Sequence, residues 1–108
     1  MLRPRTILTI ILAACALTVS PAANAQEVGK RTAEEIYNKH CTTCHATAVA
    51  NAPLAHNVEL WKARNKTVAQ FLESSKTGLN AMPPKGLCMD CTDDELKSVI
   101  EFMQSEKK

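Results

Sequence analysis

The stretch Cys41-Thr42-Thr43-Cys44-His45 decides how this sequence is interpreted. Its two cysteines stand three positions apart, so on a helical turn both thiols lie on one face, and the histidine follows directly. Cys-x-x-Cys-His is the attachment signature of a c-type haem, in which the thiols bond the porphyrin and the imidazole binds its iron. The stretch therefore predicts one covalently attached haem c, held by Cys41 and Cys44, with His45 as the proximal iron ligand.

Two other chemistries also use paired cysteines. A redox disulfide between Cys41 and Cys44, as in thioredoxin-like proteins, needs a β-α-β framework, and no stretch of this sequence alternates as a strand does. A structural four-cysteine zinc module would add Cys88 and Cys91. However, 43 residues separate the two pairs, far more than the usual separation of about 15–20. Haem attachment is the prediction, and the zinc module is an alternative.

Residues 1–25 have the pattern of a removable export signal. Two arginines precede an apolar run over residues 6–19, which is shorter than the roughly 20 residues of a membrane-spanning helix. A small-x-small cleavage pattern follows at residues 23–25. We expect a mature cytochrome domain of residues 26–108 in the periplasm. The alternative is a membrane-tethered lipoprotein anchored at Cys15, which ends a lipobox-like run.

Charge and composition narrow the possible partners. The chain carries 13 Lys and Arg against 11 Asp and Glu, a net charge of +2. Two of the cations lie in the predicted signal, so the mature domain is balanced and nothing supports a nucleic-acid partner. Large apolar residues are few in the mature part, and small domains with a thin core usually need a cofactor, a metal or a disulfide.

Three predicted helices begin with the same device, a capping box in which a Thr hydroxyl and a Glu or Gln side chain satisfy backbone N–H groups. The boxes start at Thr32, Thr67 and Thr92. A shorter, weaker helix is expected over residues 58–63. Pro83-Pro84 prevent a helix in the loop that they occupy. The sequence predicts a small all-α domain of about four short helices with two long loops.

A second protein ligand would fill the remaining iron position, and haem electron carriers often use His and Met together. Met82 precedes two prolines that stiffen its loop, as a fixed axial ligand requires. Met103 falls on the apolar face of the last helix, and Met89 lies inside a short cysteine loop. Met82 is therefore the predicted distal ligand, with His56 as the alternative. His40 is expected to face solvent.

With both axial positions filled by the protein, substrate has no access to the iron, which favours electron transfer and not enzymatic catalysis. A haem enzyme or gas sensor with an open iron is the alternative. Five cations in and around the loops are expected to form a docking patch, to screen the haem propionates, or simply to face solvent: Lys62, Arg64, Lys66, Lys76 and Lys85.

The last cysteine pair forms the short stretch Cys88-Met89-Asp90-Cys91. Two cysteines at this spacing can meet the Cα distance that a disulfide needs, and closing so short a loop stabilises by about 2 kcal/mol. We interpret the pair as a structural clip between the Met82 loop and the final helix. A catalytic dithiol is the alternative.

A longer pattern extends from residue 77 to residue 96. Residues 77–86, Thr-Gly-Leu-Asn-Ala-Met-Pro-Pro-Lys-Gly, followed by Cys88-x-x-Cys91 and Asp94-Glu95-Leu96, strongly resemble the cytochrome c5 family. The haem-attachment stretch, Ala52-Pro53 and Trp61 fall in the expected order. The resemblance covers most of residues 33–103.

The resemblance implies a class I cytochrome c fold, with the helices wrapped around one covalently bound haem. It maps the family's disulfide to Cys88 and Cys91 and its ligand methionine to Met82. It also implies a hydrogen bond between the Pro53 carbonyl and the His45 imidazole, which would orient the ring and tune the iron. Such proteins resemble monohaem carriers whose partners are redox proteins of bacterial respiratory chains.

This sequence departs from the family pattern at three positions. In the implied fold the first and last helices cross near Tyr37 and Phe102. Ala33 stands at that crossing where Gly is expected. Asn51 and Leu87 likewise stand where a small Gly is usual, and Leu87 is expected to extend the apolar rim near the haem.

Overall fold

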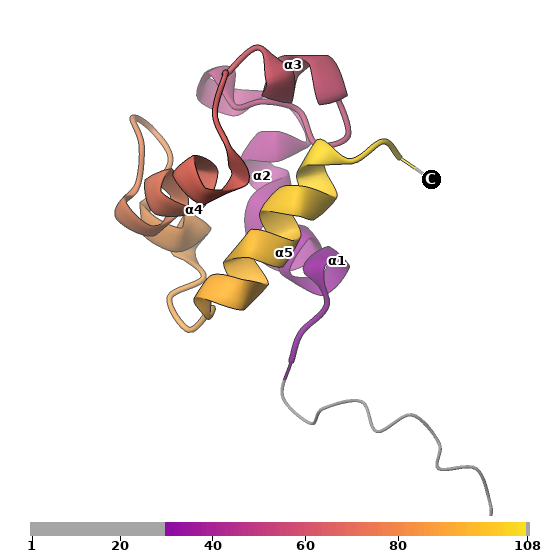
Figure 1. Ribbon diagram of the computed structural model, residues 1–108. Helices are drawn as coiled ribbons and strands as arrows, with labels where there is room; N and C mark the ends of the chain where they lie inside the picture. Colours follow the sequence, from indigo (N-terminus) through magenta and orange to yellow (C-terminus); the bar gives the residue numbers. More distant parts are fainter. Residues whose placement is uncertain (1–29, 108) are drawn as a thin grey trace, which may run out of the picture.

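The computed structural model describes residues 30–107 and shows an all-α domain (Figure 1). Its helical segments follow in chain order: α1 (Ala33–Ile36), a π-helical turn (Tyr37–Cys41), α2 (Thr42–His45), a 3-10 turn (Val49–Asn51), α3 (Val58–Lys62), α4 (Val68–Thr77), a second 3-10 turn (Pro84–Leu87) and α5 (Asp93–Gln104). Within this range the only β-pairing is one bridge between Leu79 and Met82, so the predicted fold class is confirmed.

The expected export signal and Cys15 lie outside the described residues. In residues 30–107, no helix combines the length and the apolar composition needed to cross a lipid bilayer.

All three predicted capping boxes form, at the starts of α1, α4 and α5. In each box the Thr hydroxyl accepts a hydrogen bond from the backbone N–H three residues later. The Thr32 and Thr92 N–H groups donate to Glu35 and Glu95 carboxylates at 2.7 and 2.9 Å. These contacts are local, which is why the sequence predicts them. The weaker helix α3 also forms, with the Asn57 side chain as its cap.

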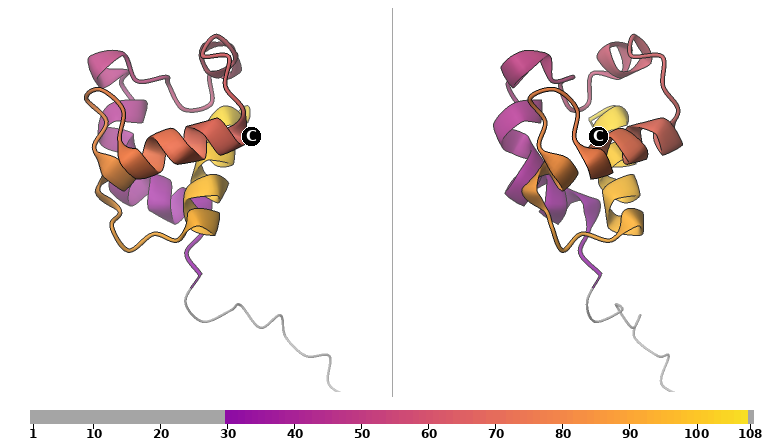
Figure 2. Two further views of the ribbon diagram at one scale, coloured as in Figure 1. Left: turned by 60° about the vertical axis from the view of Figure 1, so that its left-hand side comes forward. Right: turned by 90° about the vertical axis from the view of Figure 1, so that its left-hand side faces the viewer.

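The core lies where the two ends of the described chain meet. Helix α5 packs against both α1 and α4, and Figures 1 and 2 show it crossing α1 with α4 on its other side. Ile36 and Val99 are the largest fully buried side chains, at 1% and 2% exposure. The rings of Tyr37 and Phe102 meet at 5.6 Å between centroids, so the helix crossing implied by the resemblance is confirmed.

The π-helical turn is a feature that the sequence did not predict. It joins α1 to α2 without a break, so residues 33–45 form one helical run that contains one widened turn. Such turns carry an extra residue per turn and often occur at functional sites. Here the widened turn ends at Cys41, the first residue of the haem-attachment stretch.

The two loops are rich in left-handed backbone. Ala48, Ala50 and Asn51 have φ of 57°, 50° and 64° in the first loop, and Lys85 and Leu87 have φ of 56° and 67° in the second. A residue with a Cβ pays roughly 1–2 kcal/mol for this conformation. The φ values explain physically why Gly suits the positions of Asn51 and Leu87, the two loop departures from the family pattern.

Arg31 connects the start of the domain to its end. Its guanidinium donates two hydrogen bonds to the Asp90 carboxylate at 3.1 Å and others to Glu95 at 3.0 and 2.9 Å. Glu95 is buried, and hydrogen bonds from Arg31 and from the Thr92 N–H lower its pKa to about 2. This network joins the segment before α1 to the cysteine loop and to α5. Arg31 is 59 residues from Asp90 and 64 residues from Glu95 in the chain.

Candidate cofactor site

His45 is held as a neutral imidazole with a fixed orientation. Its Nδ1 lies 2.8 Å from the Pro53 carbonyl oxygen, and because a carbonyl only accepts, Nδ1 carries the proton. Nε2 is therefore the nitrogen with a free lone pair. Burial lowers the pKa of His45, a shift that the Pro53 carbonyl opposes and nearby Arg64 reinforces. An orientation fixed by a carbonyl behind the ring is the usual arrangement for a metal-binding histidine.

Trp61 supports the His45 ring from one side. The two rings stack with centroids 5.7 Å apart and planes 18° from parallel. The Trp61 indole N–H donates to the Leu54 carbonyl oxygen at 2.9 Å, and Phe71 packs edge-on against the indole. The imidazole is thus held by a hydrogen bond at one atom and by a stack across its face.

Cys41 and Cys44 remain unpaired thiols at the end of the same helical run. Both are partly buried. Burial, with a smaller contribution from neighbouring Cys44, raises the pKa of Cys41 to about 11. Burial thus favours the uncharged thiol at this position.

One cavity of about 320 Å³ brings the predicted haem ligands together. Cys41, Cys44, His45, Pro53 and Met82 all line it. Its floor is apolar and comes largely from α5, through Leu96, Val99, Ile100 and Met103. A largely apolar pocket with a few convergent polar groups, at a volume within about 300–1,000 Å³, is typical of a cofactor site.

The Met82 segment reaches this cavity as a tight turn. Leu79 and Met82 exchange backbone hydrogen bonds of 3.1 and 2.9 Å. Gly78, at φ 84°, lies so close that a Cβ there would stand 3.0 Å from the Met82 carbonyl oxygen. Only glycine suits that position, and Pro83 and Pro84 continue the stiff backbone.

The other candidate axial ligands differ in their position relative to the cavity. Met89 is 65% exposed and does not line the cavity. His56 also lies off the cavity, where its Nδ1 is 2.9 Å from the Ser105 carbonyl oxygen and its ring packs on Phe102. Met103 is 3% exposed and forms part of the cavity floor from within α5, consistent with its predicted role in the core.

The expectation that His40 faces solvent is wrong. His40 is partly buried, lines the cavity, and has a fully buried Nε2 with no hydrogen-bond partner among the described residues. The physical reason is the π-helical turn, which includes His40 and shifts its side chain out of the α-helical register that the sequence suggested.

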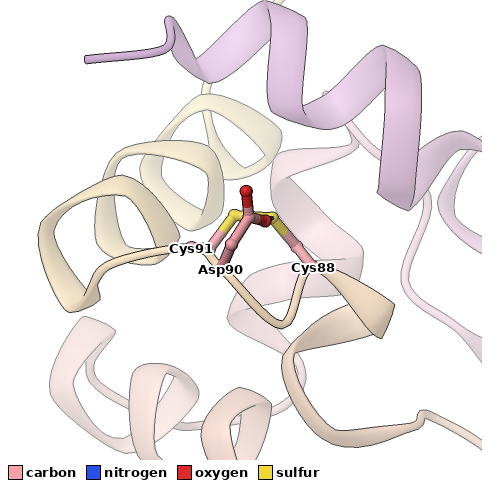
Figure 3. A group of neighbouring side chains, drawn as sticks. All are labelled: Cys88, Asp90 and Cys91. Atoms are coloured by element: carbon pink, nitrogen blue, oxygen red, sulfur yellow. Dashed lines mark hydrogen bonds between the residues drawn. A yellow bond between two sulfur atoms is a disulfide. The ribbon is translucent and has the colours of Figure 1, made fainter. Parts of the chain in front are cut away.

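Cys88 and Cys91 form a disulfide with Cα atoms 5.3 Å apart, on the short loop before α5 (Figure 3). Both are buried, at 1% and 2% exposure. The sulfurs and the Asp90 carboxylate lie within 4.8 Å of one another, but the disulfide leaves no thiolate and Asp90 binds Arg31. Over residues 30–107 the thiols of Cys41 and Cys44 join no cluster with this pair, which contradicts the four-cysteine zinc alternative.

The five loop cations differ in what they contact. Lys62 and Lys76 pair with Glu59 and Asp93 at 3.3 and 2.9 Å. Lys66 donates to Ser74. Arg64 and Lys85 line the cavity.

Comparison with known proteins gives the class of the protein. A family model described as "Cytochrome C oxidase, cbb3-type, subunit III" matches residues 29–103. The cytochrome c5 of Azotobacter vinelandii is 44% identical over 78 residues, which span 69% of this chain and 94% of that protein. The chain belongs to the cytochrome c5 family. Cytochromes c5 are monohaem electron carriers and not enzymes, so the predicted family and non-enzymatic class are confirmed.

Solved structures support this cytochrome c5 assignment. A mono-haem ferrocytochrome c from Shewanella putrefaciens is 52% identical, with a TM-score of 0.63 over 72% of this chain and 98% of that one. A chain in the crystal structure of an electron-transfer complex of nitrite reductase with cytochrome c is 28% identical, with a TM-score of 0.62 over 69% of this chain and 93% of that chain. The chain is thus an electron carrier whose partners are redox proteins.

Proposed function

We propose that this cytochrome carries one covalent haem c with His45 and Met82 as axial ligands, and shuttles single electrons between respiratory-chain proteins in the periplasm. One observation carries the proposal: two unpaired thiols, an imidazole with a free Nε2, and a thioether all line one cavity. His and Met ligation is typical of haem proteins that transfer electrons.

The residues present fit the proposed cofactor. The thiols of Cys41 and Cys44 supply the two sulfurs of a thioether attachment, and His45 offers the neutral nitrogen that an iron ligand requires. The apolar floor from α5 suits a porphyrin face. When bound, the haem would supply an iron that gains or loses one electron.

The chain's own residues then have distinct tasks. Pro53 and Trp61 hold the imidazole plane. The α5 side chains exclude water from the cavity floor, where Val99 and Ile100 are 2% and 3% exposed. A dry, preformed surrounding limits the rearrangement that accompanies a change of charge, which favours electron transfer. With two protein ligands, no position remains for a substrate.

An apolar rim supports docking of redox proteins beside the cavity. Val49, Leu79 and Leu87 line the cavity and are nevertheless 49%, 47% and 68% exposed, so they lie at its mouth. Contiguous exposed apolar groups mark interaction sites. We propose that this rim is where the electron donor and acceptor contact the cytochrome.

The periplasmic location rests on residues 1–25, with their charged start, apolar run and cleavage pattern. Covalent haem attachment agrees with export, because it removes two thiols that would otherwise oxidise in that compartment. The N-terminus of the exported protein distinguishes the two forms: cleavage after Ala25 gives free protein, whereas a lipidated Cys15 at the N-terminus gives a tethered one.

The test is made on the chain exported by a host that matures c-type cytochromes. We expect an intact mass with one haem added and little carbon monoxide binding by the reduced protein. We also expect the ferric protein to show a weak absorbance band at the red end of the spectrum, the red band, which reports a sulfur ligand on the iron. Met82→Ala should keep the haem, lose the red band and bind carbon monoxide, while Met89→Ala, the control on the exposed loop, behaves as the parent. Ready carbon monoxide binding by the parent would instead indicate an open iron and refute the Met82 assignment.

A further inference from the structure

The backbone directly after the Met82 segment makes a left-handed turn. Lys85 has φ 56° and ψ 17°, Gly86 has φ 55° and ψ 31°, and Leu87 has φ 67°. Each non-glycine residue in this conformation costs roughly 1–2 kcal/mol. Two such residues, on either side of Gly86, do not persist without contacts that compensate for the cost, so the question is what holds this turn.

Two of the contacts are backbone hydrogen bonds inside the turn. The Gly86 N–H donates to the Pro83 carbonyl oxygen and the Cys88 N–H donates to the Lys85 carbonyl oxygen, both at 3.0 Å. They close the turn on itself. They do not connect it to the rest of the domain.

The Lys85 side chain makes that connection. Its ammonium donates to the Cys91 carbonyl oxygen at 3.1 Å and reaches the Met89 carbonyl oxygen at 3.5 Å. Both acceptors belong to the loop that the Cys88–Cys91 disulfide closes. Among the ion pairs of residues 30–107 none includes Lys85, so its charge is directed at backbone carbonyls and not at a carboxylate.

The loop that receives Lys85 is itself firmly placed. Its two cysteines belong to the buried core cluster with Ile36, Leu96 and Val99. Asp90 is held by Arg31 from the start of the domain. Lys85 therefore connects a strained turn to a loop that is anchored in the buried core.

Gly86, in the strained turn, faces the Met82 side chain. A carbon placed at the Cβ position of Gly86 would stand 3.9 Å from Met82 Cε. The turn also contacts the π-helical segment, and Figure 2 shows the orange segment after α4 beside the purple-to-magenta helical run. A displacement of the turn would thus release the methionine.

We propose that Lys85 is a positioning residue for Met82: its ammonium holds residues 85–87 against the disulfide-closed loop and so keeps the thioether in place for iron ligation. The inference rests on the proposed ligation by Met82. It differs from the sequence-based expectation for Lys85, in which the cation meets a partner or a propionate.

The test compares three variants as holoproteins. Lys85→Leu removes the donors and adds no sulfur to the cavity, Lys85→Arg restores charge and donors, and Lys62→Leu is a matched control that removes a lysine paired with exposed Glu59 away from the cavity. The readouts are the red sulfur-to-iron band of the ferric form, the reduction potential, the affinity for added imidazole, and the midpoint of thermal unfolding.

We expect Lys85→Leu to retain its haem, to show a weaker red band and a lower potential, and to bind imidazole about five- to tenfold more tightly, as the loss of a charged hydrogen bond implies. Lys85→Arg should return to within about twofold of the parent, and Lys62→Leu should match it. If Lys85→Leu does not yield folded holoprotein, Lys85→Gln, which loses the charge and reach, is measured in its place.

Two negative results are distinguishable. A parent protein without the red band refutes ligation by Met82 and with it the proposed function. A parent with the band, together with a Lys85→Leu variant of unchanged band, potential and imidazole affinity, overturns the positioning role alone. A lower unfolding midpoint with those three readouts unchanged has the same meaning, because a merely structural lysine would act in that way.

Discussion

His45 and Met82 reach the same cavity from segments that are built in different ways. His45 ends a helical run of residues 33–45, and its ring is held by the Pro53 carbonyl and by Trp61. Met82 lies on a loop with one bridge to Leu79, followed by prolines and a left-handed turn. The histidine side depends on regular hydrogen bonds, whereas the methionine side depends on strained backbone held by a few side-chain contacts.

This difference predicts which side of the cavity opens first when the domain is perturbed. Helical hydrogen bonds and ring stacking act together, so losing one contact leaves the others. On the loop side, one ammonium, one disulfide and two backbone hydrogen bonds inside the turn oppose the cost of the left-handed residues. We therefore expect perturbations to open the Met82 side while the His45 side stays intact, and four changes examine that contrast.

The largest effect is expected from removing the two ligands in turn. His45→Ala should reduce the yield of haem-loaded protein at least about tenfold, since the proximal contact is lost where the cofactor attaches. Met82→Ala should keep the haem and lower the reduction potential by about 0.1–0.3 V, within the range of about 0.8 V that axial ligands span. Haem content and redox titration measure both. Equal loss of haem in the two variants would contradict the contrast.

Removing the disulfide should have the next largest effect. The double variant Cys88→Ser with Cys91→Ser loses a short closed loop, so its free energy of unfolding should fall by about 2 kcal/mol. The haem should stay attached, because its sulfurs belong to Cys41 and Cys44. Urea unfolding and absorbance measure this. Unchanged stability combined with lost electron transfer would point instead to a catalytic dithiol.

Arg31→Met should weaken the link between α1, the cysteine loop and α5. The Glu95 carboxylate has a pKa of about 2 in the fold, below its ordinary 4.5. Its contribution to stability is therefore fully present above pH 4.5 and is lost as the pH falls toward 2.

We expect Arg31→Met to lower the free energy of unfolding by about 1–2 kcal/mol at pH 7 and to flatten its dependence on pH between these values. Urea unfolding at pH 3 and pH 7 measures the change. Lys62→Met, which removes an exposed pair, is the control and should alter stability by less than about 0.5 kcal/mol. A variant as pH-dependent as the parent would show that Arg31 does not stabilise ionised Glu95.

The smallest effect concerns backbone strain on the methionine side. Leu87→Gly relieves a left-handed leucine, and after the greater flexibility of glycine in the unfolded chain is counted, we expect a gain of about 0.5 kcal/mol. Met89→Gly, on the same loop and similarly exposed but without a left-handed φ, should give no gain. Thermal unfolding of both variants measures the difference. A loss in Leu87→Gly would mean that its side chain contributes packing that outweighs the strain.

Sequence reasoning reached the features that depend on near neighbours. The capping boxes at Thr32, Thr67 and Thr92 are contacts across three residues, so their residue types are sufficient to predict them. The haem-attachment stretch is equally local. At Gly78, where α4 ends, the structure shows that a φ of 84° and the nearby Met82 carbonyl leave no space for a side chain.

Sequence reasoning did not predict the features that depend on distant segments or on a small change of helical register. Arg31 meets Asp90 and Glu95 from 59 and 64 positions away, and no local pattern signals that pairing. Lys85 was assigned to a general cationic group because its carbonyl partners become visible only when the chain turns back on itself. His40 was misplaced because a single widened turn rotated it.

The amino-acid order alone therefore determined the chemistry: which side chains can hold a haem, where helices begin, and that the domain is all-α. Only the tertiary structure decided which of those side chains share a cavity, that Met89 and His56 lie away from it, and how the Met82 loop is held. The reason is physical: capping and attachment signatures need neighbours within one helical turn, whereas a cavity and a strained loop exist only through contacts between segments far apart in the chain.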